Sequence, residues 1–353
     1  MNNSSNGRWT MCDMRCMNPH SILVLFLLAC CLSARGRIRL FCCFLFVGGL
    51  PTANSFAQTP KYSNEFLAIG VGGRSLGMSN SCVASIDDVT AGYWNPAGLL
   101  GMKNDLQIGL MHSEYFAGIA KYDYGSVARK IDSASAFAVS FVRFGVDNIP
   151  NTTELIDAAG NVDYDKITQF SAADYAFIIS YARTPKIKGL KLGGSAKIIR
   201  RVVGDFAGAW GFGLDAGVQY ENKEWKFGAM ARDITTTFNA WSYSLTQEMK
   251  DVFAATGNEI PTNSFEITLP RLILGSARKF DLMKDLTLLA EVNMDMTFDG
   301  KRNVLIKSDL MSFDPHFGLE FGYKGIVFLR GGIINIQREQ DITGNPVTTM
   351  QPN

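Results

Sequence analysis

The sequence predicts an all-β protein, a transmembrane antiparallel β-barrel preceded by an N-terminal plug segment. Three observations lead to this fold class. Apolar or aromatic residues alternate with glycine, small or charged residues in segment after segment, and short connections between these segments alternate with longer ones. A glycine-dense stretch without such alternation precedes the first segment. We therefore expect a leader over residues 1–57, a plug over residues 58–104 and a barrel over residues 105–353.

The leader contains two apolar runs, at residues 22–32 and 40–50. Neither reaches the roughly 20 residues that a membrane-spanning helix needs. The second run follows three arginines and ends in Ser55-Phe56-Ala57, which predicts a signal peptide cleaved after Ala57 and export to the outer membrane. The residues before about Arg35 are then expected to be an over-extended start. Leu27-Leu28-Ala29-Cys30 offers a lipoprotein box as the alternative.

The plug segment is rich in glycine over residues 69–78 and continues into residues 91–99. It lacks the GK[ST] ending of a phosphate-binding loop, and its glycines do not have the spacing of a dinucleotide site. Asp87 and Asp88 are expected to cap a helix that includes residues 89–93. Cys82 is the one cysteine outside the leader, so no intramolecular disulfide is expected after cleavage and a packed thiol is favoured.

The clearest strand pattern covers residues 209–220, where one face is apolar and the other is glycine-rich or polar. Opposite environments for successive side chains are typical of a transmembrane strand. A single segment of this kind would also fit a soluble sandwich. The repetition, with aromatics at both ends of an apolar stripe, favours a barrel. Eleven strands are expected, over residues 105–114, 117–128, 134–145, 169–184, 188–202, 208–221, 225–233, 268–280, 284–297, 315–323 and 326–337.

Every second connection is short, and the intervening set includes long ones at residues 146–168, 234–268 and 298–315. Bacterial barrels have short periplasmic turns and longer external loops, so the long set is expected outside. Residues 241–256 are expected to form a helix. Because bacterial barrels have even strand numbers and residues 337–353 look polar, we expect a C-terminally truncated barrel that lacks about three strands. Its open edge would not insert stably in lipid.

Chemistry-bearing constellations are sparse, so no enzyme, cofactor or metal site is expected. His112 and His316 have no partners at metal-ligand spacing, and no G-x-S-x-G elbow occurs. The near-zero net charge suggests no nucleic-acid partner. Charged residues on the lumen face are expected to pair with one another or to hold the plug; they are Lys191, Lys197, Arg201, Asp215, Arg232, Glu291 and Glu320.

The run over residues 66–99 resembles the PorV/PorQ family of outer-membrane proteins of Bacteroidota, within the superfamily of FadL-type transporters. Asn95-Pro96-Ala97 matches the plug motif of that superfamily. The resemblance covers residues 61–353 and implies about fourteen strands in the full-length family against about eleven here. This sequence departs from the family pattern at the C-terminus, where the final strands of the family barrel are missing. The plug residues singled out are Arg74, Asp87, Asp88, Asn95, Pro96 and Ala97, with Arg74 as a charge partner and Asn95-Pro96 as the seating turn.

Two functions follow from the resemblance. The first is a part in type IX protein secretion, binding or shuttling cargo with C-terminal sorting domains; its partners are cargo proteins and other secretion components. Trp241, Tyr243 and Phe253, in the longest loop, are the expected cargo contacts. The second is passive transport of hydrophobic small molecules. A lateral opening with loops arranged for protein would favour the first function, and a continuous apolar tunnel the second. A third hypothesis is that the barrel has only a structural role in the cell envelope.

Overall fold

The computed structural model describes residues 63–153, 155, 160–300, 302–340 and 345–353. The predicted signal peptide and its cleavage after Ala57 lie outside these residues. The prediction of an antiparallel all-β fold is confirmed: one curved sheet holds all the strands of the described chain. Among the described residues, no helix combines the length and the hydropathy needed to cross a membrane.

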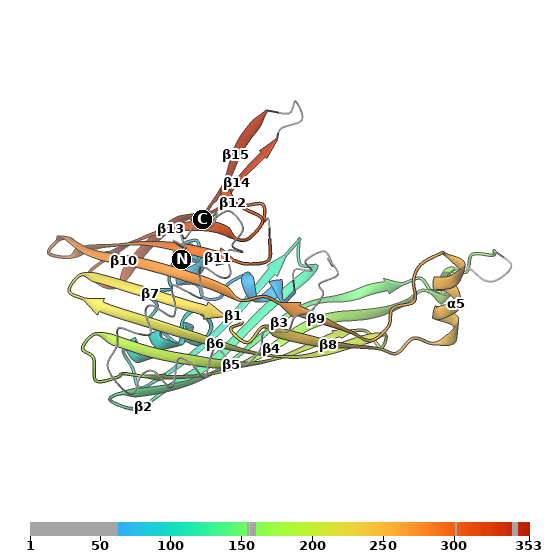
Figure 1. Cartoon of the computed structure of the whole chain (residues 1–353), viewed down its shortest axis with the longest axis horizontal. Coiled ribbons are helices and arrows are strands. Elements are labelled where there is room, and N and C mark those ends of the chain that lie inside the picture. The colour runs from blue at the N-terminus through green and yellow to red at the C-terminus, as the bar shows by residue number, and fades with distance from the viewer. Residues whose placement is uncertain (1–62, 154, 156–159, 301, 341–344) are drawn as a thin grey trace, which may run out of the picture. The chain divides into compact units, whose positions relative to one another are not determined.

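Strands follow one another around the sheet in chain order from β1 to β7, and then as β10, β11, β13, β14 and β15 (Figure 1). All the described pairs are antiparallel. The strands are β1 (Leu106–Tyr115), β2 (Ala120–Asp132), β3 (Ser135–Asn151), β4 (Thr168–Arg183), β5 (Leu190–Val203), β6 (Ala207–Asn222), β7 (Trp225–Arg232), β8 (Thr237–Tyr243), β9 (Ser264–Thr268), β10 (Arg271–Met283), β11 (Leu286–Thr297), β12 (Ile306–Lys307), β13 (Ser312–Tyr323), β14 (Val327–Gln340) and β15 (Pro346–Pro352).

The expected count of eleven strands is wrong, because the described chain has fifteen. Two of the additional strands, β8 and β9, pair with each other, and β8 also pairs with residues 207–212 of β6. Both lie in residues 234–268, which the sequence predicts as a loop because no long alternating run marks a strand there. The eleven expected segments all form strands, and the long connections all lie at one end of the sheet, as predicted.

The helix expected over residues 241–256 is also shorter than predicted. Trp241 and Tyr243 lie on β8, and α5 covers Gln247–Ala255. The side chain of Thr246 accepts a hydrogen bond from Met249 N at 3.3 Å and caps this helix. The aromatic alternation before the cap suits a strand, and the threonine cap sets the helix start.

A third correction concerns residues 337–353, which were expected to be a polar external segment without a strand. Instead β14 continues to Gln340, and β15 returns beside it. The segment from Val347 to Thr349 has three β-branched residues, which favour a strand even where the pattern is polar.

The outer face of the sheet carries an apolar belt. On β6, Trp210, Phe212, Leu214 and Tyr220 are all more than a third exposed. Ten residues separate Trp210 from Tyr220, which corresponds to roughly 33 Å along a strand. At the usual tilt of a barrel strand, roughly 40°, this length covers the roughly 25 Å apolar band of an outer membrane. The exposed face therefore has the composition and the height that lipid requires.

Guanidinium groups stack on aromatic rings near both ends of this belt. Arg200 lies over the Trp210 ring at 5.2 Å on the side of the long loops, and Arg278 lies over Trp225 at 5.2 Å near the short turns. Tryptophan and arginine both suit a boundary between lipid and water, because each combines an apolar body with a polar end.

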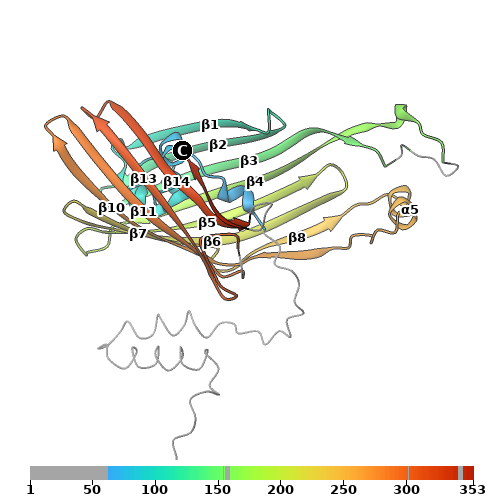
Figure 2. The same cartoon turned by 90° about the horizontal axis from the view of Figure 1, so that it is seen from above.

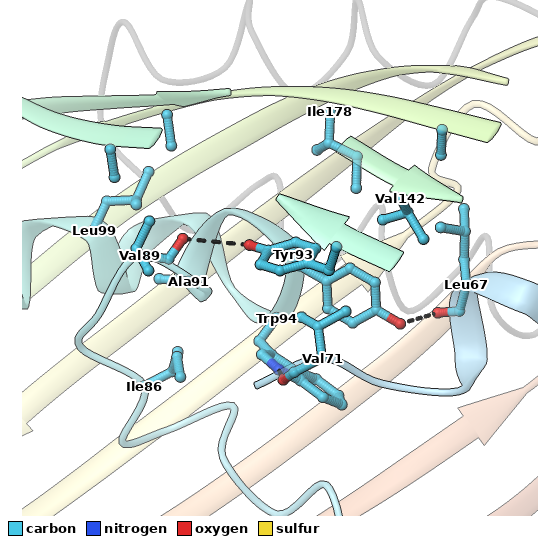
Figure 3. Close-up of a cluster of buried hydrophobic side chains, with 14 of the residues drawn as sticks. Leu67, Val71, Ile86, Val89, Ala91, Tyr93, Trp94, Leu99, Val142 and Ile178 are labelled. Atoms are coloured by element: carbon cyan, nitrogen blue, oxygen red, sulfur yellow. Dashed lines mark hydrogen bonds between the residues drawn. The ribbon is translucent and has the colours of Figure 1, made fainter. Parts of the chain in front are cut away.

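The inner face of the sheet encloses the plug, which consists of η2 (Glu65–Ala68), α3 (Gly73–Gly77), α4 (Ala91–Trp94), η3 (Pro96–Gly101) and the turns between them. Its apolar residues form the main hydrophobic core with small and apolar side chains of β2 to β5, among them Ala138, Ala176 and Ile178. Figure 3 shows Tyr93 and Trp94 at the centre of this core. The main core of the described chain therefore lies between plug and wall.

Candidate functional site

The Asn95-Pro96-Ala97 motif seats the plug against the wall. Asn95 is fully buried, and its Nδ2 donates to Val83 O at 2.9 Å and to Val218 O of β6 at 3.1 Å. Its Oδ1 accepts from Ala97 N at 3.2 Å at the start of η3. One amide side chain thus joins two turns of the plug and one strand of the wall.

Wall glycines make room for this seat. A Cβ on Gly193 would lie 2.6 Å from Pro96 C, and one on Gly217 would overlap the Asn95 side chain. Such contacts are shorter than real Cβ atoms show. The small residues of the inner face therefore mark where plug backbone touches the wall. From the sequence, the glycine-rich inner face indicated only a tightly packed lumen. The structure shows that these glycines lie where the plug contacts the wall.

Arg74 links the plug to the opposite side of the wall. Its Nε donates to Glu320 Oε2 of β13 at 3.0 Å, and its Nη1 donates to Asp87 Oδ1 at 3.0 Å. Arg330 of β14 shares the same Glu320 oxygen at 2.6 Å. Burial works against the charged form of Arg74, but the two carboxylates outweigh it, so the pKa of Arg74 is raised. The guanidinium stays charged and holds plug and wall together.

The two expected capping aspartates have different positions. The helix expected over residues 89–93 is α4, Ala91–Trp94, and its N-cap is Thr90 without a side-chain cap. Asp88 Oδ1 accepts from Thr90 N at 2.8 Å ahead of the helix, so the predicted aspartate cap is wrong. Asp87 turns instead to Arg74 and forms no cap. The side chains of Asp87 and Asp88 point in different directions, so the two neighbours bind different partners.

Arg232 on β7 holds the plug, one of the two roles expected for the charged residues of the lumen face. It is buried, and its two Nη atoms donate to Leu67 O at 3.0 Å and Tyr93 O at 3.1 Å. Its guanidinium also lies over the rings of Tyr93, at 4.9 Å, and Trp94, at 5.6 Å. Its place on the lumen face was expected, but its partners are backbone carbonyls, which sequence patterns do not reveal.

The wall is interrupted where β7 gives way to β8 and, on the adjoining strand, where β9 gives way to β10. Asp233 N–H turns inward to Asp215 Oδ1 at 2.7 Å, and Pro270 has no N–H to give to a ladder. Lys197 Nζ forms ion pairs with both carboxylates at this break, at 2.9 Å from Asp215 Oδ1 and 2.6 Å from Asp233 Oδ1. The break between β7 and β8 and the break between β9 and β10 thus lie next to each other in the sheet.

A first cavity, of about 120 Å³, lies at this interruption. Its lining combines plug residues 63–65, 67 and 68 with Asp233, Leu269 and Pro270 from the two strand breaks. Leu269 is also 43 % exposed and Ile267 54 % exposed. Residues that line the cavity are therefore accessible on the surface as well.

Polar contacts hold the plug segment that lines this cavity, Ser63–Ala68, which we call the gate segment. Asn239 Nδ2 of β8 donates to Ser63 Oγ at 2.9 Å, and Asn64 Nδ2 donates to Thr268 Oγ1 at 2.8 Å. Arg302 forms an ion pair with Glu65 at 3.1 Å. These contacts come from β8, from the end of β9 and from the loop after β11.

A second cavity, of about 490 Å³, adjoins the first and shares Glu65, Ala68, Arg232, Arg271 and Arg302 with it. Its other walls come from the plug and from β10, β11, β13 and β14. Polar residues such as Asn293 and His316 alternate there with apolar ones. The described residues show no continuous apolar tunnel among these cavities, because charged side chains line both of them.

The expected cargo-contact residues do not form one exposed loop. Trp241 Nε1 donates to Glu266 Oε2 at 3.0 Å, and Arg201 lies over the Trp241 ring at 5.0 Å. Tyr243 stacks on Trp241 with ring centroids 6.1 Å apart, and Phe253 lies apart from them on α5. All three side chains are half-buried. Pairing of β8 with β6 and β9 draws the first two into the sheet.

These strands form part of two long extensions. The β3–β4 pair and the β8–α5–β9 segment both extend beyond the other strands at the end of the sheet that carries the long loops (Figures 1 and 2). Arg201 binds Asp174 of β4 at 2.7 Å and Glu266 of β9 at 3.0 Å. The extensions thus have ionic support at their base.

The described residues contain no group of three or more His, Cys, Asp or Glu placed to hold a metal ion. No known family model and no curated protein matches the sequence. A search of solved structures found matches to the chain, among them three outer-membrane channels and transporters. The CymD monoaromatic hydrocarbon channel has a TM-score of 0.48 and 12 % identity, over 83 % of this chain and 89 % of that one. A FadL homologue of Pseudomonas aeruginosa has a TM-score of 0.42 and 11 % identity, over 76 % and 79 %. The outer membrane transporter YddB of Escherichia coli has a TM-score of 0.26 and 10 % identity, over 78 % and 39 %.

Proposed function

We propose that this chain is an outer-membrane barrel whose plug controls the passage of small, largely apolar molecules. The observation that carries the proposal is the first cavity, where plug and wall residues meet at an interruption of two neighbouring strands. The apolar belt of the outer face supports the membrane location. Leu269 and Ile267 provide an apolar surface from the belt toward the cavity.

Among the described residues, these cavities form no continuous apolar tunnel, the feature that would favour transport, so passage requires the gate segment to move. The first cavity, about 120 Å³, is smaller than the usual 300–1,000 Å³ of a small-molecule site. Withdrawal of Ser63–Ala68 would join it to the larger cavity beside it, since the two share lining residues. The segment is held by side-chain contacts at Ser63 and Asn64 and by an ion pair at Glu65, each worth about 1 kcal/mol. It is also held by hydrogen bonds from Arg232 and Tyr93 to Leu67 O and by burial of Phe66 and Leu67, which must be released as well. A shift of this segment is therefore much less costly than expulsion of the whole plug.

A disulfide lock tests this function. Ser63 and Asn239 already touch, so the double variant Ser63→Cys/Asn239→Cys can be oxidised across the gate. Cells or proteoliposomes with the oxidised variant should take up a labelled monoaromatic hydrocarbon or long-chain fatty acid at the background rate, and reduction should restore uptake. Each single cysteine variant is the control. Uptake that does not change between the oxidised and reduced forms would refute a moving gate.

The extensions of β3–β4 and β8–α5–β9 favour a second candidate, a part in type IX secretion. They project at the end of the sheet with the long loops (Figures 1 and 2) and carry exposed Val162, Tyr164 and Phe265. Here the function would be to bind cargo with C-terminal sorting domains, as the sequence resemblance implies.

Deletion of the full-length gene in the native bacterium separates the two candidates. Mass spectrometry of secreted, surface and periplasmic fractions would show whether cargo with C-terminal sorting domains accumulates in the periplasm. Accumulation would establish the secretion role. An unchanged secretome together with slower uptake of hydrophobic compounds would support the transport role.

A further inference from the structure

The second cavity concentrates polar atoms that lack hydrogen-bond partners. Across the part of the chain that the structure describes, fifteen buried side-chain N and O atoms are unpartnered, and seven of them belong to residues that line this cavity. An unsatisfied buried polar group costs about 1–3 kcal/mol. The seven atoms are Asn80 Oδ1, Arg232 Nε, Arg271 Nε, Asn293 Oδ1, Asp314 Oδ1, His316 Nδ1 and His316 Nε2.

Four of the lining residues form a square on the inner wall. Asn293 of β11 lies directly opposite His316 of β13, and Asp295 lies directly opposite Asp314 in the same register. Asn293 is 1 % exposed and His316 is 5 % exposed. Side chains two residues apart on a strand share a face, so all four point to the lumen side. The register of β11 and β13 therefore fixes the positions of these four side chains.

The charges of the cavity offset one another. Three guanidinium groups, of Arg232, Arg271 and Arg302, and three carboxylates, of Glu65, Asp295 and Asp314, line the cavity. Arg271 Nε lies 3.3 Å from Asp295 Oδ2, and His316 Nε2 lies 3.4 Å from Asp314 Oδ2, in each case without the alignment of a hydrogen bond. A charged ligand would disturb this balance, and the described residues place no group of metal ligands here.

The unpartnered atoms include donors, such as Arg232 Nε, and acceptors, such as Asn293 Oδ1. A hydroxyl group can donate one hydrogen bond and accept two, so it can satisfy either kind. The volume of about 490 Å³ lies in the range of small-molecule sites. Trp94, Val83, Ile273 and Ile334 add an apolar part to the lining.

We propose that the second cavity is a binding site for a neutral, polyhydroxylated molecule of the size of a mono- or disaccharide. The Asn293–His316 pair forms its centre, with Arg232 and Arg271 as donors on one side. The site goes beyond the proposed transport function, because its occupancy is an equilibrium property of the chain with the gate segment in place and needs no movement of that segment.

Equilibrium binding to the purified chain tests the site. The detergent must carry no sugar head group, for example a dimethylamine oxide. Glucose and maltose are titrated as neutral probes, with glucosamine and glucuronate as charged counterparts, and Trp94 fluorescence and calorimetry report binding. We expect saturable binding of at least one neutral sugar, weakened about tenfold in Asn293→Leu and in His316→Leu. Ser195→Ala, a buried inward-facing change outside both cavities, should bind like the parent chain.

Three results would overturn the proposal: no saturable binding of either neutral sugar to folded protein, tighter binding of a charged counterpart, or unchanged affinity in both leucine variants. Folding is checked by the mobility of unheated samples in SDS electrophoresis. If the leucine variants do not fold, His316→Gln serves in their place, since it keeps a polar side chain but changes the donor pattern. The oxidised gate lock should bind sugar normally, so loss of transport and loss of binding can be distinguished.

Discussion

At the scale of single residues, Cys82 reports whether the plug is in place. The thiol is fully buried in the core, and burial raises its pKa. Because only the thiolate reacts rapidly, we expect no maleimide labelling of the folded protein at pH 8 and complete labelling after heating in SDS. Ser171→Cys, at an exposed position on β4, is the positive control. Rapid labelling of Cys82 in the folded chain would contradict a seated plug.

Gly193 and Gly194 test whether inner-face glycines exist for the plug. These neighbours on β5 point to opposite faces. A Cβ on Gly193 would meet the backbone of Pro96 at 2.6 Å, whereas one on Gly194 would have its nearest contact, Asp215 O, at 3.6 Å. Gly193→Ala should therefore lower the free energy of unfolding by about 1–3 kcal/mol, and Gly194→Ala by much less. Urea unfolding in detergent measures both, and equal effects would refute the packing argument.

At the scale of elements, the loop after β11 is tied to the gate segment by acid-sensitive contacts. Burial favours the neutral form of Asp299, but hydrogen bonds from Arg302 outweigh it, so the pKa of Asp299 is lowered. The stabilisation is full above the unfolded-state pKa of about 3.9 and is lost as the pH falls through the lower folded-state pKa. The protection factors of backbone amides in residues 298–300 and 302–311, which correct for the pH dependence of intrinsic exchange, should therefore fall only below about pH 4. In Asp299→Asn, these protection factors should be low at every pH, and a profile like that of the parent chain would contradict this role.

The β8–α5–β9 extension should be separable from the barrel. No residue of α5 is buried, so its loss removes little packing. Replacement of residues 246–261 by a short Gly-Ser turn should leave the folded yield unchanged. Loss of folded barrel would contradict a peripheral role. In the secretion reading the same variant should stop cargo export, while hydrocarbon uptake should continue.

At the scale of the whole molecule, the seating of the plug should govern assembly. Asn95 bonds to Val83 and Val218, so Asn95→Ala/Pro96→Ala removes contacts on both sides of the interface. This variant should lower the folded yield, read from unheated electrophoresis, before any change in uptake per folded molecule. A normal yield with altered uptake would assign the motif to transport instead of structure.

The sequence by itself determined the all-β class, the eleven segments that form strands and the inward and outward faces of β6. Period-two alternation carries this information because successive side chains of a strand face lipid and lumen in turn, and each environment selects its own residue types. It also indicated a lumen position for Arg232 and Glu320. Strands β8, β9, β12 and β15 escaped prediction because such short segments depend on pairing with neighbouring strands, which a local pattern does not record.

Only the tertiary structure decided what the inner face does. Gly193 and Gly217 became the footprint of the plug, and Arg232 found backbone carbonyls as its partners. Trp241 and Tyr243 moved from an expected contact loop into the sheet. Asn293 and His316 face one another only because β11 and β13 pair in one register. Contacts between residues far apart in the chain depend on this pairing and on the path of the plug, and both are properties of the assembled barrel.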